Sequence, residues 1–150
     1  MGNTLERSEL IGGIWDSDLN KYPDTEYNFT SSCGYSCKIK RSPQWTYCGY
    51  VQLPIDHPYY NKNYDEINDL DTIYVHGDLT FSNDGLFGFD CWHTLMGDIS
   101  PLEETMCAKD PHMFPRFDHF KKTTPHYWTF DDVKRETNNM AQQFFNIVNK

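Results

Sequence analysis

Histidine and aspartate side chains gather in one short stretch of the sequence, residues 75–98. Imidazole and carboxylate groups carry out general acid–base catalysis, and both are ligands for zinc, manganese or iron. A metal at an open site lowers the pKa of a bound water molecule and activates it for hydrolysis. His76, Asp90 and His93 are therefore candidate catalytic residues. The same three residues and Asp98 are candidate ligands for a divalent cation, zinc or manganese.

Two other interpretations of these side chains stay open. In a structural network, His76 would bond a loop carbonyl, Asp90 would cap a turn, and His93 would pack between aromatic rings. In a binding pocket without a metal, the polar and aromatic side chains of this region would hold a ligand. The candidate ligand-binding residues are His57, Tyr60, His76, Thr80, Ser82, Asp90, Trp92 and His93.

The chain has five cysteines, and the sequence offers no secretory context for disulfides, so reduced thiols are predicted. Cys33, Cys37 and Cys48 could form a zinc site with His57, although the spacing matches no common zinc pattern. Cys91 could act as a nucleophile beside a histidine. Its predicted place on an apolar strand face favours an inert core thiol instead.

Two strand-like runs, residues 71–82 and 86–93, must position the histidines and aspartates. A two-residue loop, Asp84-Gly85, leaves polar and apolar side chains mixed on both faces of the hairpin. A three-residue loop, residues 83–85, separates the faces, so we predict this longer loop. It pairs Asp78 with Asp90, and the repulsion between these carboxylates would be relieved by water, a raised pKa or a cation. The predicted apolar face holds Val75, Leu79, Phe81, Phe87, Phe89 and Cys91, and the polar face holds His76, Asp78, Thr80, Ser82 and Asp90.

The remaining elements predict an α+β domain over residues 36–150. The runs at residues 37–42 and 45–53 read as two strands joined by a turn at Arg41–Gln44, which gives an antiparallel sheet of about four strands. Residues 129–148 predict an amphipathic helix, with Thr129 and Asp132 in a capping box. This helix should pack on the apolar face of the sheet, with Glu136 on its solvated side. Residues 1–35 read as a polar, partly ordered extension.

The charge of the chain narrows the classes of partner. The formal net charge is −9, and such a surface repels the phosphates of nucleic acids and of anionic membranes. We therefore expect no general nucleic-acid binding and no membrane association. No run of residues approaches the length of a membrane span, and the N-terminal residues do not resemble a secretory signal.

Four segments resemble a family of small uncharacterised proteins from phages and bacteria. They are "CGYVQLPIDHPYYNKNYDEI", "VHGDLTFS", "FGFDCWHTLMGDISP" and "FDDVKRETNNMAQQF". The resemblance covers about residues 36–148 and implies a viral or mobile-element setting, without an established activity. Asp78 stands where the family has glycine, which argues against a shared role for this residue. Two extra residues between His93 and Gly97 put the placement of Asp98 in doubt.

Three functions from different classes fit these observations, and whether the protein is an enzyme stays open. The first, which we prefer because no catalytic constellation is complete, is a viral or phage-type accessory protein. It would bind a host or viral protein, or a small anionic ligand, without catalysis. The second is a small metal-dependent hydrolase of a phosphate-bearing or nucleotide-like substrate. The third is a minor virion component with residues 1–35 as an arm. These functions would place the protein in the host cytoplasm or in the virion.

Overall fold

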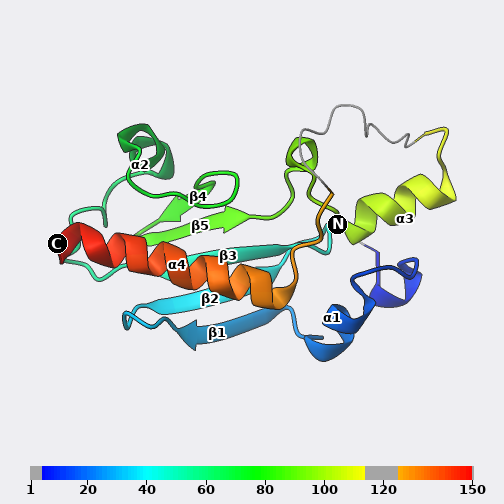
Figure 1. Cartoon of the computed structure of the whole chain (residues 1–150), viewed down its shortest axis with the longest axis horizontal. Coiled ribbons are helices and arrows are strands. Elements are labelled where there is room, and N and C mark those ends of the chain that lie inside the picture. Colours follow the sequence, from blue (N-terminus) through cyan, green and yellow to red (C-terminus); the bar gives the residue numbers. More distant parts are fainter. Residues whose placement is uncertain (1–4, 114–124, 150) are drawn as a thin grey trace.

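An antiparallel sheet forms the centre of the molecule (Figure 1). The computed structural model describes residues 5–113 and 125–149. In this part of the chain the sheet has five strands in the order β1-β2-β3-β5-β4. The strands are β1 (Glu26–Thr30), β2 (Ser36–Arg41), β3 (Tyr47–Gln52), β4 (Phe81–Asn83) and β5 (Leu86–Asp90). The predicted α+β class is confirmed, and β1 adds an edge strand from the segment that was expected to be an extension.

Helix α4 (Phe130–Val148) lies across one face of the sheet and packs mainly on β3 and β2. The predicted capping box is present: the Asp132 N–H donates to Thr129 Oγ1 over 3.1 Å, and the Thr129 N–H donates to Asp132 Oδ2 over 3.2 Å. The apolar stripe of the helix meets alternate side chains of the strands, because those side chains point to the same face. The buried helix residues are Phe130, Val133, Thr137, Met140, Ala141 and Phe144.

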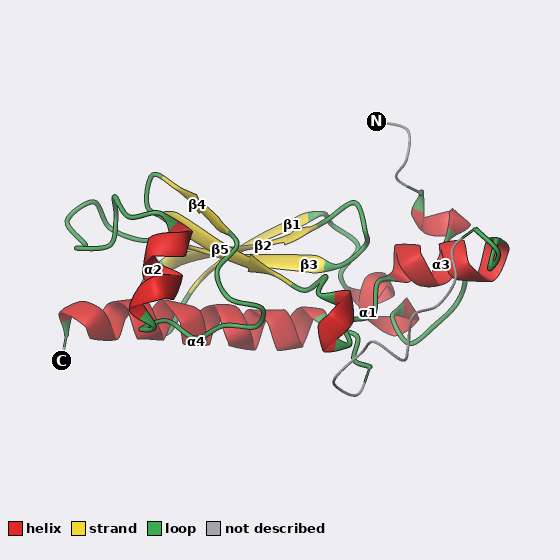
Figure 2. Cartoon of the chain, turned by 90° about the horizontal axis from the view of Figure 1, so that it is seen from above, coloured by secondary structure: helices red, strands yellow, loops and turns green. Residues whose placement is uncertain are grey.

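The other helices are short and lie beside or beyond the sheet. They are α1 (Asp16–Lys21), α2 (Tyr64–Leu70) and α3 (Pro101–Lys109), with 3₁₀ turns at Arg7–Glu9 and Thr94–Met96. Figure 2 shows α4 beneath the sheet, whereas no helix of the described residues covers the opposite face. We call this opposite side the open face. No described helix is long and apolar enough to cross a membrane.

The β4–β5 hairpin differs from the prediction. Asn83 pairs with Leu86, so the loop is the two-residue Asp84-Gly85, and the predicted three-residue loop is wrong. Both loop residues have positive φ, 48° and 79°, as a type I′ turn requires. The shorter loop turns Phe81 onto the open face, where its ring meets the Tyr50 ring edge-on at 5.5 Å between centroids. The predicted place of Phe81 on the helix-covered face is therefore also wrong.

The register change also separates the two aspartates that were predicted to face each other. Asp90 pairs with Cys48 of β3, and Asp78 lies in a turn closed by its N–H to the Val75 carbonyl, at 3.0 Å. The repulsion expected between Asp78 and Asp90 therefore does not arise from strand pairing. The predicted burial of the other apolar residues is confirmed, namely of Val75, Leu79, Phe87, Phe89 and Cys91.

The segment before β1 packs against the same core as the sheet. Leu10, Trp15 and Leu19 are buried. The Asp18 carboxylate accepts a hydrogen bond from the Tyr127 hydroxyl at 2.9 Å and another from the first N–H of α4, that of Phe130, at 3.0 Å. This segment thus fixes the start of a helix that lies more than one hundred residues further along the chain.

Candidate functional site

The structure brings together four of the residues that the sequence analysis singled out: His76, Asp90, His93 and Asp98. We call them the His–Asp cluster. His76 Nε2 lies 2.8 Å and 2.7 Å from the two carboxylate oxygens of Asp98. The backbone N–H of His93 donates to Asp98 Oδ2 over 2.8 Å. The two imidazole rings meet edge-on, with 5.3 Å between their centroids.

Asp90 and His93 form the second half of the cluster. Their Oδ1 and Nε2 atoms lie 3.2 Å apart, which is an ion-pair distance. His93 Nε2 is buried and makes no hydrogen bond among the described residues. Asp90 instead accepts hydrogen bonds from the Thr80 hydroxyl and from the backbone N–H of Trp92, at 3.1 Å and 3.0 Å. Asp90 thus ties the end of β5 to the chain that enters β4.

Helix α4 and the residues before it hold His76 in place. Its backbone N–H donates to Glu136 Oε2 over 2.8 Å, so Glu136 points toward the cluster rather than to solvent as expected. The Trp128 ring lies against the His76 imidazole, with 4.4 Å between centroids. The sequence did not assign Trp128 to this cluster, and it placed Glu136 on the solvated side of the helix, because neither residue is near the central motifs in the sequence.

Burial limits what the His–Asp cluster can do chemically. Asp98 is 2% exposed, and the His76 side chain is 11% exposed. Both oxygens of Asp98 already accept hydrogen bonds from within the protein, so few lone pairs are left for an incoming ion or substrate. Within residues 5–113 and 125–149, no group of three His, Cys, Asp or Glu side chains is arranged to hold a metal. The arrangement is that of a polar network that joins three segments of the chain.

Of the other predicted ligand-binding residues, Thr80 and Trp92 contact the cluster through Asp90, whereas His57, Tyr60 and Ser82 make their contacts elsewhere. His57 is buried, and its ring nitrogens bond the Phe144 carbonyl at 2.8 Å and the Tyr59 N–H at 2.9 Å. Ser82 accepts a hydrogen bond from the N–H of Tyr64 at 3.0 Å, at the start of α2. Tyr60 lies beside the hairpin turn, against Gly85. These side chains support loops and helix ends.

All five cysteines are free thiols. Burial raises the pKa of the Cys37 thiol and of the Cys48 thiol to about 11. Burial, reinforced by the Asp98 carboxylate, raises the pKa of Cys91 well above its usual value. A thiol that stays protonated at neutral pH is a poor nucleophile. These three environments therefore favour structural cysteines, and the fully buried Cys91 agrees with its predicted place in the core.

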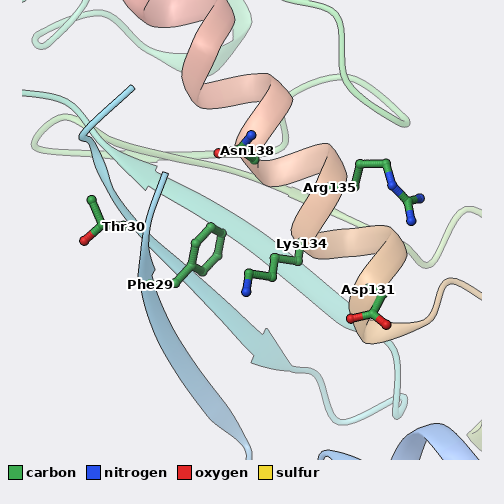
Figure 3. A pocket seen from close by; sticks show the side chains of 6 residues that line it. All are labelled: Phe29, Thr30, Asp131, Lys134, Arg135 and Asn138. Carbon is green, nitrogen blue, oxygen red and sulfur yellow. The ribbon is translucent and has the colours of Figure 1, made fainter. Parts of the chain in front are cut away.

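A groove that the sequence analysis missed lies between the edge of the sheet and α4. This β1–α4 groove is shallow and open to solvent, has a volume of about 410 Å³, and is lined by Phe29, Thr30, Asp131, Lys134, Arg135 and Asn138. Figure 3 shows the Lys134 side chain pointing toward the Phe29 ring and the Arg135 side chain pointing away from β1. The Lys134 ammonium lies 5.2 Å from the centroid of that ring.

Hydrogen bonds join α4 to the chain before and after β1. At one end, Asp131 Oδ1 accepts from the Tyr22 hydroxyl at 3.2 Å. At the other end, Asn138 Oδ1 accepts from the N–H of Ser32 at 2.8 Å, and its amide donates to the Ser32 hydroxyl at 3.1 Å. The spacing between β1 and α4 is therefore fixed by the protein itself.

The outer edge of β1 runs along this groove. The N–H of Arg41 donates to the Thr25 carbonyl, and the N–H of Ser31 donates to the Tyr35 carbonyl, both over 2.8 Å. In an antiparallel pair the residues that bond the neighbouring strand alternate with residues that face away. The backbone groups of residues 26, 28 and 30 therefore point outward, where no other strand of the described chain pairs with them.

Comparison with known proteins identifies no relative: no family model matches the sequence, and neither the curated proteins nor the solved structures contain a significant match. The resemblance to the phage and bacterial family therefore stays a prediction, as does the viral setting that it implies.

Proposed function

We propose that this protein is a binding protein without catalytic activity, and that it captures an extended segment of a partner protein on the free edge of β1. The observation that carries this proposal is the β1–α4 groove beside unpaired backbone groups. An added strand gains affinity from main-chain hydrogen bonds and specificity from the pockets that its alternate side chains enter. Here the outward groups of residues 26, 28 and 30 would supply the hydrogen bonds, and the groove would take the side chains.

The two edges of the sheet differ in a way that favours β1. The β4 edge is only three residues long. The chain that leads into it is covered by α2, because the Asn68 amide bonds both the N–H and the carbonyl of Leu79. Natural sheets protect their edges with short strands and covering elements of this kind. In the described part of the chain β1 has neither protection, and its outward-facing residues 26, 28 and 30 are exposed.

The His–Asp cluster supports a binding function more than a catalytic one. Its carboxylates bond His76 and the residues that flank β5, and the His76 N–H links this region to Glu136 of α4. His76 is nearly closed off from solvent by Trp128 and Asp98. A general base must reach the proton that it removes. A buried imidazole whose Nε2 is held by a carboxylate is better suited to fixing the architecture of the sheet and helix.

Asn28→Pro is the sharpest test of strand addition. Proline removes the outward N–H of Asn28, and an edge strand tolerates this because that N–H makes no bond within the sheet. We expect wild-type protein to bind immobilised octapeptides of alternating valine and threonine, and Asn28→Pro to lose this binding at an unchanged melting temperature. Asn28→Ser keeps the N–H and should bind normally.

Hydrogen exchange on the wild-type protein gives a second measurement that needs no variant. Bound octapeptide should protect the backbone amides of residues 26, 28 and 30. It should leave the exchange rates of the amides elsewhere on the open face unchanged. Protection confined to the open face, or equal binding by Asn28→Pro, would show that the protein does not use the β1 edge.

A further inference from the structure

We infer that the segment captured at the β1 edge is acidic, and that one of its carboxylates pairs with Lys134 in the β1–α4 groove. This inference rests on the proposed function and specifies the chemistry of the partner. The lining of the groove contains two cations and a single carboxylate, that of Asp131, which already accepts the Tyr22 hydroxyl. The Lys134 side chain extends from α4 toward β1, and its ammonium lies over the Phe29 ring (Figure 3).

The two groove cations differ in their availability to a ligand. The Arg135 side chain is 75% exposed, points away from β1, and lies 3.4 Å from Asp132. The contact that the structure gives to the Lys134 ammonium is with the face of the Phe29 ring, which attracts a cation without neutralising its charge. Lys134 is therefore the groove cation placed to meet an incoming carboxylate.

The distribution of charge over the molecule also favours an acidic partner at this edge. The chain carries a net charge of −9, yet six of the nine Lys and Arg residues in the described part lie on α1, β2 and the first half of α4, around β1. They are Lys21, Lys38, Lys40, Arg41, Lys134 and Arg135. The elements around β1 also carry six carboxylates, so this part of the surface is close to neutral and repels an acidic segment less than the rest of the chain does.

Strand geometry defines the sequence that the groove would select. Side chains two residues apart on an added strand point to the same side and lie about 6.6 Å apart. One such position would place a Glu or Asp carboxylate beside Lys134, and the next would place an apolar side chain on the exposed side of the Phe29 ring. The expected partner is thus an extended acidic segment with alternating acidic and apolar side chains on one face.

The test compares three immobilised octapeptides of alternating valine and threonine in which a central valine is replaced by Glu, Gln or Lys, so that the residues two positions away on the same face stay apolar. We expect wild-type protein to bind the Glu peptide about threefold more tightly than the Gln peptide, as a single exposed charge pair allows. Lys134→Gln should remove this preference. Arg135→Gln is the matched control, because it removes the same charge from the adjacent residue, and it should keep the preference. Lys134→Glu should reverse the preference in favour of the Lys peptide.

The outcomes separate this inference from the proposed function. Equal binding of the Glu and Gln peptides, or equal effects of Lys134→Gln and Arg135→Gln, overturns the acidic partner. If Asn28→Pro still abolishes binding of every peptide in that case, strand addition at β1 stands. A Glu preference that survives unchanged in Asn28→Pro shows a carboxylate bound away from an added strand, which overturns both.

Discussion

At the scale of single residues, the Asp98 carboxylate makes the hydrogen bonds that link His76 to His93 in the His–Asp cluster. It is buried and accepts hydrogen bonds from the His76 ring and the His93 backbone. Asp98→Asn keeps the shape but loses one acceptor and turns an amide toward a donor. We expect this change to lower the free energy of unfolding by about 2 kcal/mol, measured by urea denaturation.

Asp90→Asn is the matched control for this prediction. The Asp90 side chain is about one third exposed, so water can replace part of what the substitution removes. We expect a loss of less than about 1 kcal/mol. Equal losses in the two variants would contradict the central place of Asp98 in the network.

Gly77 lets the cluster close, because a side chain at this position has no room. Its φ is +69°, and an added Cβ would lie 2.1 Å from His93 Nε2. Gly34 has a φ of +98° but open space around it. We expect Gly34→Ala to cost about 1 kcal/mol of stability from backbone strain alone, and Gly77→Ala to cost clearly more.

The His93→Ala background isolates the steric part of this effect. In protein that lacks the His93 imidazole, thermal denaturation should show that Gly77→Ala lowers stability by nearly as much as Gly34→Ala does. A cost for Gly77→Ala that does not change in this background would mean that His93 does not press on this turn.

At the scale of elements, the hairpin shows where sequence reasoning failed and why. The longer loop was preferred because it separated polar from apolar side chains. The Asp84-Gly85 turn decided the register instead, since both residues adopt the positive φ of a type I′ turn. Separating polar from apolar side chains was the wrong criterion, because Phe81 packs on Tyr50 on the open face. The sequence by itself does not show that this face is partly apolar.

The C-terminal helix was predictable in more detail than any strand. Its capping box and its apolar spacing are both local signals, and the structure confirms them. The membership of His76, Asp90, His93 and Asp98 in one cluster was also anticipated, because these residues are close in sequence. The β1–α4 groove was not, because the alternation of polar and aromatic residues in β1 is only five residues long and lies in a polar, turn-rich segment.

Thr129 is the local cap of α4, and its loss should be measurable. Thr129→Ala removes the acceptor for the Asp132 N–H. We expect the free energy of unfolding to fall by about 1 kcal/mol, as is usual for an N-cap. Thr129→Ser keeps the hydroxyl, so its free energy of unfolding should fall by only a few tenths of the loss in Thr129→Ala. Denaturation curves that do not distinguish the two variants would show that Asp18, which bonds the Phe130 N–H, caps the helix alone.

At the scale of the whole molecule, buried thiols and phenols make stability depend on alkaline pH. Burial raises the pKa of Cys37 and Cys48 to about 11, and burial raises the pKa of Tyr47 and Tyr127 further. The unfolded chain therefore releases these protons at lower pH than the folded chain. Stability from these groups is complete below about pH 9 and is lost as the pH rises toward 11 and beyond.

Urea midpoints at pH 7.5, 9 and 10.5 would measure this loss. We expect little change between the first two values and a clear fall at the third. Cys48→Ser removes one of the titrating groups and should make the fall shallower. A midpoint that is constant up to pH 10.5 would contradict the burial of these groups.

The order of elements along the chain has a consequence for biosynthesis. Protein synthesis proceeds from the N-terminus, so all five strands leave the ribosome before α4 does. Until α4 follows, Ile39, Val51 and Phe87 have no cover on their side of the sheet, although they are fully buried in the finished fold. A nascent chain at this stage exposes an apolar sheet face together with the unpaired β1 edge, a combination that promotes aggregation. The arrival of α4 is thus the step at which a vulnerable translation intermediate becomes a stable protein.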